Sequence, residues 1–206
     1  MNAWLVRIAL DLRQRSCNND LRDVVALHRR VMSLVPNDLG DHARHRGGVL
    51  FRLDHSRTGP TLLAQSCIPP HLTRLPDGYG EVAIRDIGPL LKALEPGMRV
   101  RYRIAANASK RVAVGDAAGK VVPLLGTAAE DWWHRKAHTS GLDLRTLTVQ
   151  PEPAAVGRIK DVRHSITRFD GTAVITNADD VRTAILTGIG RGKSFGCGLL
   201  NLAPER

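Results

Sequence analysis

A glycine-rich segment near the C-terminus has the residue types of an anion-binding loop. It reads Gly188-Ile-Gly-Arg-Gly-Lys-Ser-Phe-Gly-Cys-Gly198, and glycines let a backbone approach a ligand closely and turn its amides outward. A plain flexible turn would not require the two interleaved cations. A helix is expected before the segment and a strand after it, the reverse of a P-loop. We therefore interpret it as a cradle for an RNA backbone. The candidate contacts are Gly190, Arg191, Gly192, Lys193 and Ser194.

One histidine has a position that suits proton transfer. His28 lies beside Leu27 on the apolar stripe of an expected helix over residues 21–35. Imidazole is the side chain that exchanges protons near neutral pH. On spacing alone, the position also suits a histidine packed into the core. Arg29 and Arg30 follow directly, which is compatible with a phosphate nearby.

Two further groups of basic residues suit contacts with a phosphate backbone. Cations at alternating strand positions line one face of a sheet, where they can neutralise phosphates. The same pattern also describes a solvated sheet surface, so spacing alone leaves both interpretations open. The first group comprises Arg101, Arg103, Asn107, Lys110 and Arg111, and the second comprises Arg158, Lys160, Arg163 and Arg168.

The overall charge points to an anionic partner. The net charge is +10 at pH 7, an excess that is typical of nucleic-acid binding and less often of binding to a membrane surface. No apolar run approaches the roughly 20 residues that span a bilayer, and the N-terminal residues do not resemble a signal peptide. We expect a cytoplasmic protein without a membrane partner. Because aromatic residues make up only 4% of the chain, we expect charge and backbone contacts to dominate over stacking.

The cysteines and histidines do not form a metal-binding pattern. Cys17, Cys67 and Cys197 are far apart and odd in number, which favours reduced thiols in the cytoplasm. The pairs His42 with His45 and His134 with His138 lack a third ligand at a suitable spacing. The sequence therefore predicts neither a metal nor a cofactor.

The expected elements give an α+β chain with two tandem ferredoxin-like units. The first half reads βαββαβ, the ferredoxin-like pattern, and the second half is expected to be a degenerate copy. The predicted domains are 1–108, which carries His28, and 121–206, which carries the glycine-rich loop, with a linker at 109–120. The elements expected in the first half are strand 3–12 and helix 21–35 with cap candidates at 17–20, strands 48–54 and 61–68, helix 87–97 and strand 98–108. Those of the second half are helix 127–138, a hairpin across 144–168, strand 171–177, helix 178–188 and strand 197–203.

Three segments together resemble the CasE family of type I-E CRISPR-associated RNA endonucleases, a branch of the RAMP superfamily with RRM-like folds. GIGRGKSFGCGLLNLAP is similar to the C-terminal signature of the family, and RIAANASKR to its Arg-x-x-Ala-Asn-x-x-Lys segment. ALHRRVMSLVP resembles the first-helix segment, whose histidine is the catalytic residue of the family. The resemblance implies that His28 is catalytic here. Some members carry a tyrosine three residues earlier, where this chain has Val25, so the second catalytic group is left open.

The resemblance implies a metal-independent endoribonuclease without a cofactor. Its substrate is a CRISPR repeat stem-loop in pre-crRNA, cut at the 3′ base of the hairpin. The RNA's own 2′-hydroxyl attacks the phosphate and leaves a 2′,3′-cyclic phosphate, with Arg29 or Lys110 stabilising the developing charge. Members of the family retain the mature crRNA and join the other subunits of the type I-E effector complex. The residues expected to bind RNA are Arg30, Arg103, Asn107, Arg111, Arg158, Lys160, Arg163 and the five loop residues given above.

Two alternatives remain. The first is a non-catalytic RNA-binding RAMP subunit, which Val25 in place of tyrosine favours. The second is a basic RNA-binding protein unrelated to CRISPR, which leaves the C-terminal signature unexplained.

Overall fold

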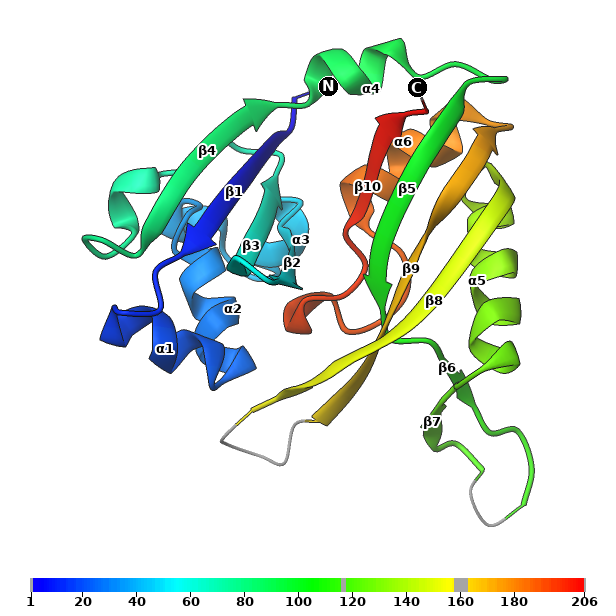
Figure 1. Ribbon diagram of the computed structural model, residues 1–206, viewed down its shortest axis with the longest axis horizontal. Coiled ribbons are helices and arrows are strands. Elements are labelled where there is room, and N and C mark those ends of the chain that lie inside the picture. The colour runs from blue at the N-terminus through cyan, green and yellow to red at the C-terminus, as the bar shows by residue number, and fades with distance from the viewer. Residues whose placement is uncertain (1, 116–117, 158–162, 206) are drawn as a thin grey trace.

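The protein is built from two four-stranded antiparallel sheets, each with its own helices (Figure 1). The computed structural model describes residues 2–115, 118–157 and 163–205. The strands are β1 (Trp4–Leu10), β2 (Leu50–Ser56), β3 (Gly59–Ser66), β4 (Gly80–Asp86), β5 (Arg99–Ala106), β6 (Ser109–Arg111), β7 (Val121–Pro123), β8 (Leu142–Val156), β9 (Arg163–Ile175) and β10 (Leu200–Pro204). The α-helices are α1 (Arg15–Leu21), α2 (Val24–Met32), α3 (Ala43–Arg46), α4 (Gly88–Ala93), α5 (Thr127–Thr139) and α6 (Ala178–Thr187). The short 3₁₀ helices are η1 (Asn37–Leu39), η2 (Leu72–Arg74) and η3 (Lys193–Phe195).

The first sheet has the strand order β2-β3-β1-β4, with α1 and α2 between β1 and β2. Alternate residues of β1, among them Val6 and Ile8, are buried, as expected for a strand with one face on the core. Only η2 and a loop connect β3 to β4. The first unit therefore has a single 3₁₀ turn where the simple ferredoxin-like pattern has its second helix.

The second sheet has the matching order β10-β5-β9-β8, with α5 after β5 and α6 after β9. Its departures from the simple pattern are the small β6–β7 hairpin inserted after β5 and the length of β8 and β9. The prediction of an α+β chain with two tandem ferredoxin-like units is confirmed.

The strand predicted over 98–108 has a different place from the one we expected. β5 pairs with β9 and β10, with Ile104 opposite both Phe169 and Leu200, so it begins the second unit. The strand that completes the first sheet is β4. Assigning β5 to the first unit was wrong, because its local pattern specifies a strand but not its partners. In place of a division at 108, we propose that the domain boundary lies in α4.

Two further boundaries differ from those expected. α1 covers residues 15–21, and Asp23 rather than any of residues 17–20 caps α2, by accepting a hydrogen bond from Val25 N at 3.0 Å. The first arm of the expected hairpin lies in β8, and its second arm and the strand expected over 171–177 form one continuous strand, β9. Gly171, the first residue of the strand expected over 171–177, lies inside β9 at a close approach, because a Cβ there would lie 2.0 Å from the Thr146 carbonyl oxygen.

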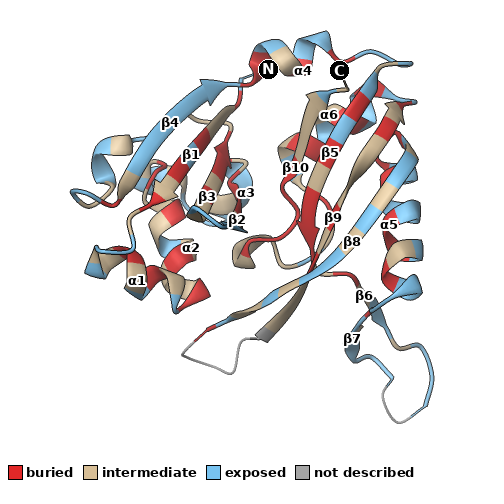
Figure 2. Ribbon diagram, in the orientation of Figure 1, coloured by how far each residue is buried: buried red, intermediate tan, exposed pale blue. Residues whose placement is uncertain are grey.

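Each unit has its own hydrophobic core, visible as the buried strips of Figure 2. The core of the first unit gathers Ile8, Leu27 and Phe51 between its sheet and α2. In the core of the second unit, Trp133 of α5 packs on Phe169 of β9, with ring centroids 5.5 Å apart. No helix among the described residues is long and apolar enough to cross a membrane.

Candidate active site

Helix α2 holds His28 at the edge of the first core. Val24, Leu27 and Val31 form the buried stripe of the helix, and His28 lies beside that stripe and is half-buried. Its ring stacks on Phe51 of β2, with centroids 6.1 Å apart and planes inclined by 29°. The Nδ1 atom is buried and makes no hydrogen bond within the described part of the chain. Proton exchange with a substrate therefore has to use Nε2.

The surroundings of His28 favour its neutral form. Burial lowers the pKa of the imidazole, and the positive charge of Arg44 lowers it further. A neutral imidazole at pH 7 can accept a proton, which is the first requirement for a general base.

Two cations complete this cluster. Arg44 lies on α3 and donates a hydrogen bond from Nη1 to the Val49 carbonyl oxygen at 3.3 Å, just before β2. Lys193 begins η3, which packs against both α2 and β2. Burial lowers the pKa of each cation, and Arg44 also lowers that of Lys193. Arg44 therefore acts electrostatically on both His28 and Lys193.

Among the described residues, the cluster has no carboxylate counter-charge. Within residues 2–115, 118–157 and 163–205, neither Arg44 nor Lys193 forms an ion pair with a carboxylate. Half-buried cations that repel one another cost free energy until an anion enters. The arrangement of His28, Arg44 and Lys193 is thus suited to an anionic group such as a phosphodiester.

The backbone conformation of the glycine-rich loop places Lys193 next to α2. All five glycines of residues 188–198 have φ values between 73° and 89°, a region that residues with a Cβ rarely adopt. The loop is closed by a hydrogen bond from Ile189 N to Gly198 O at 3.0 Å and anchored to β5 by one from Gly198 N to Ala105 O at 2.7 Å. At Gly196 a Cβ would lie 3.4 Å from the Phe51 ring, on which His28 stacks.

Asn107 fastens the loop from the other side. Its Nδ2 donates to the Ser165 carbonyl oxygen of β9 at 2.7 Å, and its backbone forms an isolated bridge with Arg191. Phe195 in η3 stacks on His164 of β9, with centroids 4.1 Å apart, and burial and Arg191 lower the pKa of that histidine. The loop is therefore held by β5, β9 and the first unit together.

The structure brings only some of the predicted residues to this cluster. Gly190, Gly192 and Ser194 belong to the loop that contains Arg191 and Lys193. Arg29 is exposed on α2. Arg30 is held by an ion pair with Asp20 at 2.8 Å and lies over the Tyr79 ring, 5.3 Å from its centroid.

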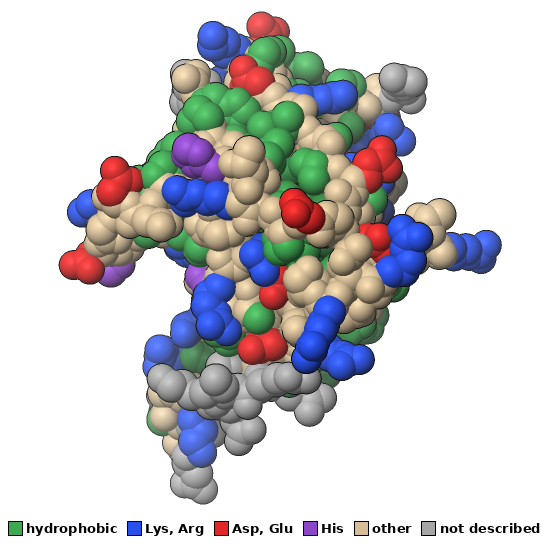
Figure 3. Space-filling view, turned by 90° about the vertical axis from the view of Figure 1, so that its left-hand side faces the viewer, with side chains coloured by type: hydrophobic (Ala, Val, Ile, Leu, Met, Phe, Trp, Pro, Cys, Tyr) green, Lys and Arg blue, Asp and Glu red, His purple; other side chains and the backbone are tan. Residues whose placement is uncertain are grey.

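The other predicted residues lie elsewhere. Lys110 and Arg111 are exposed on β6, which Figure 1 places across the molecule from α2. The structure therefore does not bring Lys110 to His28, and we do not assign it to charge stabilisation. Arg158 and Lys160 lie outside the described residues. Arg163 begins β9, and its side chain is also outside the described part. Figure 3, which faces the left-hand side of Figure 1, shows Lys and Arg side chains gathered in the lower half of that face.

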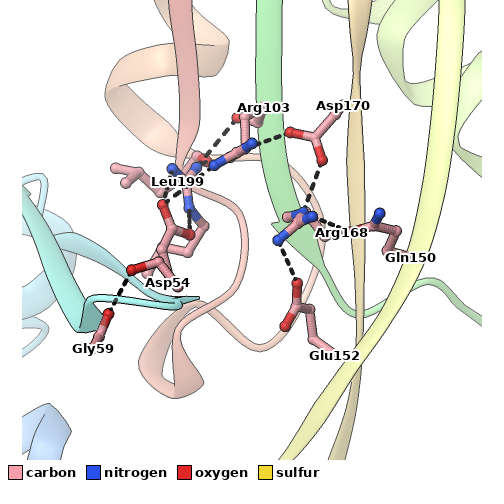
Figure 4. A network of polar contacts seen from close by, with 10 residues as sticks. Asp54, Gly59, Arg103, Gln150, Glu152, Arg168, Asp170 and Leu199 are labelled. Carbon is pink, nitrogen blue, oxygen red and sulfur yellow. Dashed lines mark hydrogen bonds and ion pairs between the residues drawn. The ribbon is translucent and has the colours of Figure 1, made fainter.

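Arg103 lies in a network of alternating charges that runs between the two sheets (Figure 4). Arg103 pairs with Asp170 and, at 3.8 Å, with Asp54. Arg168 bridges Asp170 at 2.7 Å and Glu152 at 2.9 Å. These carboxylates compensate the two arginines, so the role of Arg103 in RNA binding stays a prediction.

Sequence reasoning missed Arg44 and His164. Arg44 lies between His42 and His45, a pair that the sequence suggests only as candidate metal ligands, and nothing in the sequence places it beside residue 28. His164 adjoins Arg163 in the basic hairpin, but its stacking on Phe195 joins residues far apart in the chain. Among the described residues, no group of three or more His, Cys, Asp or Glu side chains is placed to hold a metal ion.

Comparison with known proteins places this geometry among CRISPR proteins. A family model described as CRISPR associated protein matches residues 3–204. The CRISPR-associated endoribonuclease Cse3 of Thermus thermophilus is 30% identical over 219 residues, which cover 98% of this chain and 100% of that protein. The Cascade subunit CasE of Escherichia coli is 28% identical over 196 residues, which cover 89% of this chain and 93% of that protein.

A solved structure of Thermus thermophilus Cse3 bound to an RNA that represents a pre-cleavage complex is also similar. It matches with a TM-score of 0.86 and 27% identity, and the match covers 99% of this chain and 100% of that one. The similarity therefore extends over both ferredoxin-like units.

Proposed function

Since this chain belongs to the family of CRISPR associated proteins, we propose that it is the endoribonuclease that cuts CRISPR repeat RNA in pre-crRNA. The observation that carries the proposal is the cluster of His28, Arg44 and Lys193. A neutral imidazole lies close to two half-buried cations that have no carboxylate partner among the described residues. The similarity to Cse3 over nearly all of both chains supports the same reaction class.

In the proposed reaction the RNA supplies its own nucleophile. The 2′-hydroxyl upstream of the cut attacks the adjacent phosphorus while Nε2 of His28 accepts its proton. The bond to the 5′-oxygen then breaks, and that oxygen takes a proton to become a 5′-hydroxyl. The upstream fragment ends in a 2′,3′-cyclic phosphate. Because the nucleophile is intramolecular and close to its target, the chemistry needs alignment, proton transfer and charge stabilisation rather than a metal-activated water.

Charge stabilisation falls to Arg44 and Lys193 in this proposal. The phosphorane carries more negative charge than the phosphodiester, so fixed cations around it bind the transition state more strongly than the ground state. Arg29, exposed one residue after His28, is a further candidate for the same phosphate.

The proposed partners follow from the same similarity. The substrate is a repeat stem-loop cut at the 3′ base of its hairpin, and its duplex part is gripped mainly through shape and phosphates. The Escherichia coli relative is a subunit of Cascade, so we infer that this chain keeps the mature crRNA and joins the other subunits of a type I-E effector complex. We place this work in the cytoplasm, which the three free cysteines favour.

The direct test is cleavage of repeat RNA in the presence of EDTA. We expect a single cut in the stem-loop, and we expect no cut when the nucleotide just upstream carries a 2′-deoxy sugar, since the nucleophile is then missing. Gel analysis with an end-group assay for the cyclic phosphate measures both. Cleavage of the 2′-deoxy substrate would contradict the proposed nucleophile, and a strict need for a divalent cation would contradict the proposed chemistry.

Arg44 supplies a second prediction. Arg44→Gln is expected to slow cleavage about 10²- to 10³-fold, the usual effect of removing one donor that stabilises transition-state charge. Arg46→Gln is the matched control, because Arg46 lies on the same helix but is exposed and donates to the Leu39 carbonyl oxygen. Single-turnover rates with excess protein measure the difference. Equal rates for the two variants would remove Arg44 from the mechanism.

A non-catalytic RNA-binding subunit remains the second candidate, because Val25 stands where some relatives carry tyrosine. Val25 is half-buried and has no group that exchanges protons. Tight binding of repeat RNA without a cut in the EDTA assay would favour this candidate.

A further inference from the structure

A cavity of about 300 Å³ lies between the two units beside the His28 cluster. Its walls come from α1, α2, β2, β5, β8, β9 and the glycine-rich loop. The volume is at the lower end of the range for small-ligand pockets, roughly 300 to 1,000 Å³. It therefore suits one flat ring system rather than a longer stretch of chain.

Three of these walls also build the His28 cluster. Val24 and Leu27 line the cavity from α2, one of them next to His28 in the sequence. Phe51 lines it and stacks on His28. Phe195 and Gly196 line it from the loop that carries Lys193. A group bound in the cavity is thus a near neighbour of a phosphate held at the cluster.

The aromatic residues favour a planar ligand. The chain contains only three phenylalanines, and two of them, Phe51 and Phe195, line this cavity. Unpaired bases of RNA are recognised by stacking on such rings and by hydrogen bonds to their edges.

The carboxylates that line the cavity favour the edge of a base over a phosphate. Asp54 and Glu152 line it and are held by ion pairs with Arg52 at 2.7 Å and Arg168 at 2.9 Å. Carboxylates repel phosphate, but each retains lone pairs that can accept a hydrogen bond from an amino or imino group of a base. Arg22 and His55, which also line the cavity, are exposed.

We propose that this cavity binds the base of one unpaired nucleotide of the repeat RNA, next to the cleaved phosphate. The inference rests on the proposed function and deepens it, because the cavity then contributes to sequence specificity outside the duplex. Binding the base there fixes the adjacent sugar and phosphate at His28, which supplies part of the alignment that an intramolecular attack needs.

The test combines abasic RNA with variants that fill the cavity. Each unpaired nucleotide of the repeat is replaced in turn by an abasic residue, and single-turnover cleavage rates are measured. We expect one position next to the cut to lose about ten- to a hundredfold in rate, in line with the contribution of one stacked base. If the intact repeat is cut normally and no abasic substitution changes the cleavage rate, the cavity proposal is overturned and the proposed function is left intact.

Ala154→Trp fills the cavity from β8. We expect it to slow cleavage of intact RNA by a similar factor and to remove any further effect of the abasic substitution. Val156→Trp provides a second filled variant that the fold tolerates, because Val156 lines the cavity and is 52% exposed. Leu125→Trp is the control, since Leu125 is 68% exposed and lies outside the cavity.

The outcomes separate the two proposals. An abasic effect that persists at full size in both filled variants would overturn the cavity proposal. If the unmodified protein does not cut intact repeat RNA at all, the proposed function is overturned, and this inference with it.

Discussion

Replacing His28 with alanine is expected to slow cleavage of repeat RNA by about 10²- to 10⁴-fold and to leave RNA binding intact. The half-buried imidazole is the side chain of the cluster that ordinarily exchanges protons near neutral pH, and burial and Arg44 lower its pKa and favour the proton-accepting form. Single-turnover cleavage measures the first effect, and filter binding of a 2′-deoxy repeat RNA measures the second. A variant that cuts at the normal rate would exclude His28 from proton transfer.

His45→Ala is the matched control, since His45 is exposed on α3 beside Arg44. The pH dependence gives a further check on the same residue. Burial and Arg44 lower the pKa of His28, so the neutral, proton-accepting form predominates above that pKa. Cleavage should therefore rise with pH, with a midpoint below the ordinary histidine value of about 6.5. In Arg44→Gln the midpoint should move upward, because a repelling charge is gone.

Replacing Arg52 with methionine is expected to lower the free energy of unfolding by about 3–5 kcal/mol. The Arg52 side chain is 3% exposed and pairs with Asp54 at 2.7 Å. Its Nη1 also donates to the carbonyl oxygens of Arg103 at 3.3 Å and Leu199 at 3.4 Å, both in the second unit. Methionine keeps much of the volume but removes the Arg52 donor from two carbonyl groups and from Asp54, which retains only the longer ion pair with Arg103 at 3.8 Å. Urea unfolding followed by tryptophan fluorescence measures the loss.

A double variant separates charge from packing at this position. Adding Asp54→Asn to Arg52→Met removes a carboxylate that has lost its closer cation, so part of the lost stability should return. The exposed pair between Arg99 and Glu205 provides the comparison, and Arg99→Met should leave unfolding nearly unchanged. An Arg52→Met protein as stable as Arg99→Met would show that the contact between the units does not depend on this side chain.

Local sequence patterns predicted elements well where one face of an element is buried. The stripe of Val24, Leu27 and Val31 specified α2, and all three are buried. Patterns of this kind record which side of an element faces a core, because burial follows the helical or strand period. The tandem arrangement of two units could therefore be predicted from the sequence.

The pairing partners of a strand could not be predicted from the sequence, because they depend on residues far away in the chain. β5 has the alternation of a strand in either sheet, and only its register with β9 and β10 places it in the second. Gly171 shows a similar limit. The residue breaks a strand by propensity, yet here it admits the Thr146 carbonyl at a distance that no Cβ permits.

The candidate site likewise has parts that the sequence could predict and parts that it could not. The sequence and its family resemblance predicted a role for His28 and for the glycine-rich loop, whose five positive φ values favour glycine. The role of Arg44 could not be predicted from the sequence, since α3 is a single short turn that follows His42, whose backbone has a left-handed conformation. Its proximity to His28 and Lys193 exists only once three separate segments have folded together.

That dependence has a consequence during synthesis on the ribosome. His28 and Arg44 emerge early, but Lys193 and the glycines that shape its loop are translated more than a hundred residues later. The loop is fastened to β5 and β9, so it takes shape only after the second unit closes. A nascent chain that has folded its first unit alone carries the imidazole without Lys193 or the loop that grips the RNA. On the proposed mechanism, such an unfinished copy lacks one of the two cations that stabilise charge and the loop that aligns the RNA.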